Sequence, residues 1–199
     1  FGSCVARPTG FDPTAGAYTC TGACDCKLGE TCDPTGHCAP DPVPTRFVSA
    51  GATGNGLSIT APSGDFRAMI TSLPAGANVA VRGGQTFASD GGPVVLTAAN
   101  ISVQGGYVVC STTRWVRDAT QTSTITNANP GFGFINLTGT FAFPAADVVI
   151  GGLTLQHPPS SSGTRVLVDA IYAPRLHVHD LVVVQPAPSG NVTMVQVIN

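Results

Sequence analysis

The sequence predicts an all-β protein: a right-handed parallel β-helix (β-solenoid) with a short N-terminal capping helix and a small disulfide-rich N-terminal module. Three observations support this fold class. Charged residues make up only 10% of the 199 residues, whereas surface helices need many Lys, Glu and Arg side chains. Short runs of Val, Thr and Ile are broken by Gly, Pro, Asn and Asp, which is typical of many short strands. Six of the seven cysteines precede residue 39.

The cysteines of residues 1–40 predict a disulfide framework, because this segment has almost no apolar periodicity and is too small to bury a core. The candidates are Cys4, Cys20, Cys24, Cys26, Cys32 and Cys38. The alternative is a zinc site, but only one residue separates Cys24 from Cys26 and only His37 lies nearby. The pairing stays open, since six cysteines allow 15 connectivities. Because seven cysteines cannot all pair, either Cys110 is a free thiol, or it forms a disulfide and another cysteine stays unpaired.

Three prolines within residues 40–44 predict an extended linker. The expected organisation is a disulfide-rich module over 1–40, a Pro-rich linker over 41–46 and a parallel β-helix over 47–199. The chain begins at Phe1 rather than at Met, and we expect that a signal peptide has been removed. We also expect the β-helix to be incomplete at its C-terminus.

A repeat supports the solenoid. Several segments share an apolar–any–apolar pattern followed within two residues by Gly, Asn or Asp, which tolerate a sharp bend. The second apolar positions are spaced by 22, 22, 25 and 28 residues, at Val81, Val103, Ile125, Ile150 and Val178. Such a period holds two or three short strands and leaves no room for a crossover helix, so the strands are expected to stack in parallel.

One short helix is predicted over 65–73. Phe66, Met69, Ile70 and Leu73 fall on one face, and Pro74 ends the helix. We expect this helix to cap the N-terminal end of the solenoid, where strand edges would otherwise meet water.

The region from residue 47 to about residue 118 resembles the opening of bacterial surface or secreted proteins of the pectin-lyase-like superfamily. The shared features are a strand and Gly-rich segment, a short helix, a Pro-Ala-Gly turn, a strand, a Gly-Gly-Tyr segment and an Arg-Asp pair. They correspond here to Phe47–Gly51, residues 65–73, Pro74–Gly76, Val79–Val81, Gly105–Tyr107 and Arg117–Asp118. The resemblance implies a right-handed parallel β-helix, an architecture that hosts lyases, hydrolases, adhesins and inert spacers.

No catalytic set and no cofactor site is predicted. Polysaccharide cleavage needs clustered carboxylates, but the aspartates are scattered, at Asp90, Asp118, Asp147, Asp169 and Asp180. His177 and His179 are weak metal candidates, because alternate strand residues face the same side, about 7 Å apart. We favour their interpretation as surface histidines, since they match the outward positions of the repeat.

The favoured function is a non-catalytic, secreted or cell-surface structural or adhesive protein whose β-helix serves as a shaft or binding surface. The alternative is a carbohydrate-active enzyme or a carbohydrate-binding module, so a carbohydrate ligand is a candidate partner. A net charge of −2 excludes a basic nucleic-acid footprint, and no apolar run reaches the ~18 residues of a membrane span. Val195 and Val197 lie in a strand-like end, from which we expect a homo-oligomer or filament through the C-terminal region.

Overall fold

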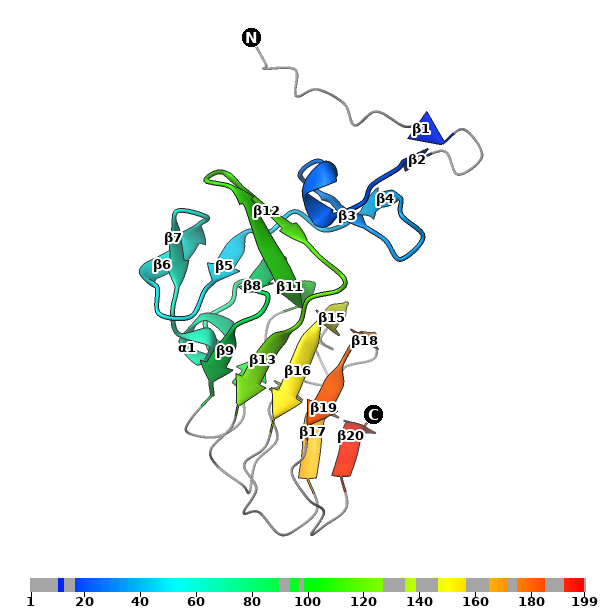
Figure 1. The fold of residues 1–199 in the computed structure, drawn as a ribbon. Helices are drawn as coiled ribbons and strands as arrows, with labels where there is room; N and C mark the ends of the chain where they lie inside the picture. Colours follow the sequence, from blue (N-terminus) through cyan, green and yellow to red (C-terminus); the bar gives the residue numbers. More distant parts are fainter. Residues whose placement is uncertain are drawn as a thin grey trace.

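In the computed structural model, the regular elements of the described residues are short strands, apart from one short α-helix and one 3-10 helix (Figure 1). It describes residues 11–12, 17–89, 94–96, 99–126, 135–138, 147–156, 165–171, 175–184 and 192–198. The first elements are β1 (Phe11–Asp12), β2 (Ala17–Tyr18), the 3-10 helix η1 (Ala23–Asp25), β3 (Glu30–Cys32), β4 (Cys38–Pro40), β5 (Arg46–Val48), β6 (Thr53–Ser58), β7 (Ala61–Ser63) and α1 (Phe66–Thr71).

From β8 onward the chain contributes strands to three sheets in turn. The strands are β8 (Asn78–Arg82), β9 (Thr86–Ala88), β10 (Val94–Leu96), β11 (Ile101–Ser111), β12 (Arg114–Arg117), β13 (Ser123–Thr126), β14 (Ile135–Thr138), β15 (Val148–Gly151), β16 (Leu153–Gln156), β17 (Arg165–Ile171), β18 (Leu176–His179), β19 (Val182–Val184) and β20 (Val192–Ile198). Two four-stranded sheets have the orders β9-β13-β16-β19 and β10-β14-β17-β20, and all their pairs are parallel.

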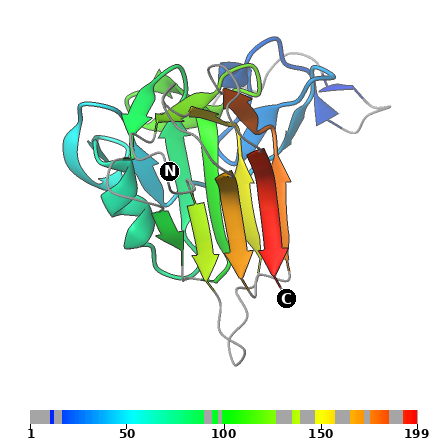
Figure 2. The same ribbon diagram turned by 90° about the horizontal axis from the view of Figure 1, so that it is seen from below.

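The largest sheet has eight strands and is mixed. The order β18-β15-β11-β8-β5 is parallel, and β7 continues it in parallel next to β5. β6 pairs with β7 in antiparallel fashion, and β12 folds back antiparallel onto the long β11. We call the eight-stranded sheet and the two four-stranded parallel sheets together the sheet body. Figure 2 shows strands of the sheet body side by side, with the blue N-terminal module beyond one end of them.

Sharp bends separate consecutive strands of different sheets. Gly152 alone joins β15 to β16, and its φ of +63° lies in the left-handed region that glycine tolerates. Asp180 stands at the corresponding bend after β18 with φ +49°. These bends let one sheet follow another without a crossover helix.

The core lies between the sheets and is filled by aliphatic side chains. Val79, Val103 and Ile150 are cross-strand partners in the largest sheet, and each is at most 2% exposed. Ile125 and Leu155 are cross-strand partners in the β9-β13-β16-β19 sheet and are likewise buried. Alternate side chains of each strand face this core, as strand geometry requires.

The predicted helix is present but shorter than expected. α1 has six residues, and the Asp65 carboxylate caps it by accepting a 2.8 Å hydrogen bond from the Ala68 N–H. It lies against β9 and β10, with Phe66 buried against Phe87 at a ring-centroid distance of 6.1 Å. α1 is thus part of the core packing, and its expected role as the capping helix of a solenoid was wrong.

The prediction of a right-handed parallel β-helix was also wrong. The described strands form several sheets, and the largest mixes parallel with antiparallel pairs. The expected repeat register fails as well. Val103 lies beside Val79 rather than Val81, and Ile125 belongs to a different sheet from Val103 and Ile150. A spacing of 22 to 28 residues identified recurrent strands, but it did not identify the sheet to which each strand belongs.

Candidate functional site

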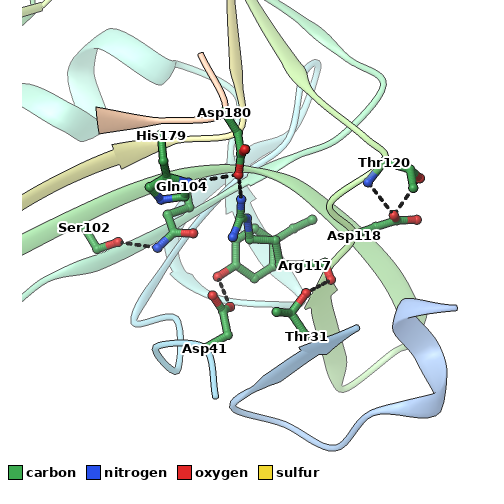
Figure 3. A network of polar contacts seen from close by, with 10 residues as sticks. Thr31, Asp41, Ser102, Gln104, Arg117, Asp118, Thr120, His179 and Asp180 are labelled. Atoms are coloured by element: carbon green, nitrogen blue, oxygen red, sulfur yellow. Dashed lines mark hydrogen bonds and ion pairs between the residues drawn. The ribbon is translucent and has the colours of Figure 1, made fainter. Parts of the chain in front are cut away.

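Ionisable side chains gather where the N-terminal module meets the outer face of the largest sheet (Figure 3). We call Asp41, Tyr107, Arg117, His179 and Asp180 the junction cluster. They come from the segment after β4, from β11, from β12, from the end of β18 and from the bend that follows it. Segments far apart in the sequence therefore meet at one place.

The β11–β12 hairpin positions two members of the cluster. Tyr107 and Arg117 are direct antiparallel partners, so their side chains emerge on the same face. That hairpin folds over the sheet, and Tyr107 packs with Ala80 and Trp115 in a small apolar cluster. The Trp115 ring meets Phe47 edge-on at a centroid distance of 5.5 Å.

Tyr107 fastens the segment after the module to the sheet. Its hydroxyl donates a 2.8 Å hydrogen bond to the Asp41 carboxylate. Burial raises the pKa of Asp41, while the Tyr107 hydroxyl and the charge of Arg117 oppose that rise. Burial and the neighbouring Asp41 charge raise the pKa of Tyr107 far above its usual value, so the phenol keeps its proton.

Arg117 and Asp180 form an ion pair at the other side of the cluster. The Arg117 Nη2–Asp180 Oδ2 distance is 2.8 Å, and the side chains are 10% and 60% exposed respectively. His179 Nδ1 lies 2.9 Å from the same carboxylate oxygen. These contacts lower the pKa of Asp180, with the hydrogen bond from His179 as the largest cause and Arg117 next.

These hydrogen bonds link protein groups to one another, so the arrangement joins segments of the chain. Thr31 of the module reinforces it by donating a 2.6 Å hydrogen bond to the Arg117 carbonyl. Among the described residues, three buried side-chain atoms have no hydrogen-bond partner: Arg117 Nε and Gln104 Oε1 here, and Ser89 Oγ elsewhere. Chemically, the cluster can stabilise a contact between distant segments, and its strength depends on pH through its carboxylates.

Three disulfides hold the module, and one of them ties it to the sheet. Cys20 pairs with Cys32, Cys26 with Cys38, and Cys24 with Cys110. Cys4 lies outside the described residues. The partner of Cys24 was missed by sequence reasoning, because no local spacing relates residues that are 86 positions apart.

The structure does not join the metal candidates into a site. His177 pairs with Val149 across the sheet, and His179 is held by Asp180. Among the described residues, the one group with metal-ligand spacing consists of Cys20, Cys26 and Cys32, whose sulfurs are engaged in disulfides. The self-association candidates, Val195 and Val197, lie in β20 opposite Val168 and Ala170, and their side chains are outside the described part.

The scattered aspartates have separate structural contacts. Asp118 accepts hydrogen bonds from Thr120 in its own turn, and Asp147 pairs with Arg175 at 3.1 Å. Asp90 and the side chain of Asp169 are outside the described part.

A cavity of about 380 Å³ lies between the module and the turn at residues 118–120, and the Cys20–Cys32 disulfide forms part of its wall.

No helix in the described part of the chain is long and apolar enough to cross a membrane. No family model, curated protein or solved structure matches this chain. The expected membership of the pectin-lyase-like superfamily is therefore unsupported by any match, and the mixed sheets described above contradict it.

Proposed function

We propose that this protein is a non-catalytic extracellular structural protein in which the Cys-rich module and the sheet body act as one stiff unit. The observation that carries this proposal is the Cys24–Cys110 disulfide, which joins the module to β11 across 86 residues. Disulfides persist in oxidising surroundings, so the three bridges are compatible with an extracellular location.

Hydrogen bonds around that disulfide support the same role. The Arg114 guanidinium donates to the carbonyls of Cys24 and Cys26 at 2.7 and 2.9 Å. Together with the bonds from Thr31 and Tyr107, these contacts fix the orientation of the module on the sheet. A covalent link surrounded by charge-assisted hydrogen bonds resists bending better than a free linker does.

An adhesive role on the outer face of the β9-β13-β16-β19 sheet is a second candidate. Its outward positions are uncharged and combine methyl groups with hydroxyls and one amide. They are Thr86, Ala88, Thr124, Thr126, Thr154, Gln156, Val182 and Val184. Such a face suits an uncharged, regular surface such as a polysaccharide, without requiring any cleavage.

Self-association through residues 176–199 remains part of this proposal. Among the described strands, β18 and β19 are edge strands of their sheets, so each pairs with a neighbouring strand on one side only. Val182 and Val184 are 47% and 41% exposed on β19. A second copy that pairs with these strands would cover both the backbone groups and the valines.

The test uses the full chain with a panel of soluble and insoluble polysaccharides. We expect no new reducing ends and no unsaturated uronide product, and co-sedimentation with at least one insoluble polysaccharide. Thr124→Glu places a charge on the outer face and should weaken that binding about tenfold, whereas Thr113→Glu on the distant hairpin should not. Cleavage of any polysaccharide would overturn the non-catalytic proposal.

Self-association is measured separately by sedimentation velocity at micromolar concentration. We expect a species larger than the monomer and its loss in Val182→Lys, because a charged edge residue opposes strand pairing. A strictly monomeric wild-type chain would contradict self-association. The structural role and polysaccharide binding would still be decided by the polysaccharide experiments.

A further inference from the structure

Four cysteines of the module stand at equal spacing and come together in space. Five residues separate each of them from the next, at positions 20, 26, 32 and 38. The Sγ atoms of Cys20, Cys26 and Cys32 all lie within 4.8 Å of one another. Cys38 adds a fourth sulfur 2.09 Å from that of Cys26. The two disulfides of the module are thus stacked in one sulfur cluster, and Cys24–Cys110 is a separate bridge.

We propose that the reduced form of this module binds one Zn²⁺ ion through four thiolates, those of Cys20, Cys26, Cys32 and Cys38. Zinc prefers tetrahedral thiolate sites with Zn–S distances of about 2.3 Å, which places the sulfurs about 3.8 Å apart. After reduction, the sulfurs of each pair, Cys20–Cys32 and Cys26–Cys38, must move apart from about 2.1 Å to about 3.8 Å. The distances from the Cys26 sulfur to those of Cys20 and Cys32, at most 4.8 Å, need to shorten by about 1 Å or less. Side-chain rotation supplies movements of this size.

The backbone that positions these cysteines does not depend on the disulfides alone. Cys32 and Cys38 face each other in the β3–β4 ladder. The Cys20 N–H donates to the Gly36 carbonyl at 2.8 Å. The Cys26 carbonyl accepts from Arg114 of the sheet body at 2.9 Å. None of these bonds involves a sulfur atom, so reduction does not remove them directly, and we expect them to keep the four thiols near one another and to lower the entropic cost of assembling the site.

The sulfur cluster is also accessible. The cavity of about 380 Å³ beside the turn at residues 118–120 is lined by Cys20 and Cys32. This cavity is therefore the route by which a small reductant or a hydrated cation would approach the Cys20–Cys32 disulfide.

The two states exclude each other because the same sulfur atoms take part in both. Reduction by a phosphine breaks the two S–S bonds. Each disulfide receives two electrons from one phosphine and two protons from water, and the water oxygen leaves as phosphine oxide. Binding of Zn²⁺ then displaces the four thiol protons. The metal form is expected wherever the chain meets zinc before its disulfides form.

The test is a metal titration of the full chain, reduced with a phosphine under argon, using Co²⁺ as the probe. We expect one Co²⁺ per chain, with the intense visible absorption of tetrahedral cobalt, a sulfur-to-cobalt charge-transfer band and displacement by one equivalent of Zn²⁺. The oxidised chain should bind none.

Two matched double variants locate the ligands. Cys24→Ser with Cys110→Ser removes the separate bridge and should retain the tetrahedral spectrum. Cys20→Ser with Cys32→Ser should lose that spectrum and weaken Zn²⁺ binding at least about 100-fold, with far-UV circular dichroism as the check on folding. The proposal is overturned if the reduced wild-type chain binds no stoichiometric metal. It is also overturned if the Cys20/Cys32 variant binds as tightly as the wild type.

Discussion

The imidazole ring of His179 occupies the space where a side chain on Gly151 would lie. A Cβ built on Gly151 would overlap the ring atoms of His179, its cross-strand partner on β18. Gly151 is therefore required because it lets the His179 ring rest on the sheet, where its Nδ1 reaches the Asp180 carboxylate at 2.9 Å.

Gly151→Ala should displace that ring and destabilise the protein by about 1–2 kcal/mol, through the lost His179–Asp180 contact and local overpacking. In a His179→Ala background the same substitution should be neutral or stabilising, because alanine suits a strand better than glycine. Urea unfolding of the four proteins measures the difference. Equal costs in the two backgrounds would contradict this account.

Tyr107→Phe should cost about 1–2 kcal/mol at pH 7, because it removes the hydrogen bond to the partly buried Asp41 carboxylate. The folded-state pKa of Asp41 is raised, so its contribution to stability is fully present below the unfolded value of 3.8 and is lost as pH rises through the folded value. The variant raises that pKa further. Its deficit should therefore be larger at pH 7 than at pH 3, as measured by urea unfolding at both pH values.

Asp41→Asn is the control for this prediction. In that background Tyr107→Phe should cost less than in the wild type, and the pH dependence of its cost should disappear. A pH-independent cost in the wild-type background would show that Tyr107 acts only through packing.

The individual strands were predictable from the sequence, because alternation alone marks the buried Val103 and Ile150 and the bends after them. The assembly of strands was not. Each period contains strands of several sheets, and spacing does not say that Ile125 leaves the sheet of Val103. The antiparallel return of β12 onto β11 likewise left no periodic mark in the sequence.

The junction cluster was not predictable for a related reason. Asp41 and Tyr107 are 66 residues apart, and Arg117 and Asp180 are 63 apart. Each is an ordinary polar residue in its local segment, and only the folded sheet brings them together. The clustering of cysteines did indicate disulfides, but the pairing of Cys24 with Cys110 needed the three-dimensional arrangement.

Val103→Asp should cost several kcal/mol or prevent folding, because Val103 has no exposed surface and a carboxylate there would find no partner. Val109→Asp is the matched control on the same strand. Val109 is 42% exposed, so its replacement should cost less than about 1 kcal/mol. Circular dichroism and urea unfolding compare the two. Near-native stability of Val103→Asp would show that the core is assigned to the wrong face of β11.

Asp180→Asn should cost about 1 kcal/mol at pH 7, a modest value because the Asp180 side chain is 60% exposed although Arg117 is buried. Asparagine tolerates the positive φ of this bend, so the substitution isolates the charge. The folded-state pKa of Asp180 is lowered, so its stabilisation is present above the unfolded value of 3.8 and is lost as pH falls through the folded value. The difference between wild type and variant should close in acid. A constant difference from pH 7 to pH 2 would contradict the ion-pair explanation.

Removal of disulfides should rank by the length of the loop that each one closes. Cys24–Cys110 spans 86 positions, whereas Cys20–Cys32 spans 12. The chain-entropy model assigns about 4.6 kcal/mol to the longer loop and about 3 kcal/mol to the shorter. Replacing both cysteines of a pair by serine avoids a stray thiol, and urea unfolding of each double variant gives the cost.

The Cys24/Cys110 variant should also expose the segment 41–46 to proteases, because the module then depends on hydrogen bonds such as Tyr107–Asp41 to stay on the sheet. If the Cys20/Cys32 variant were the less stable of the two, the entropic ranking would be wrong and the sulfur cluster of the module would dominate its stability.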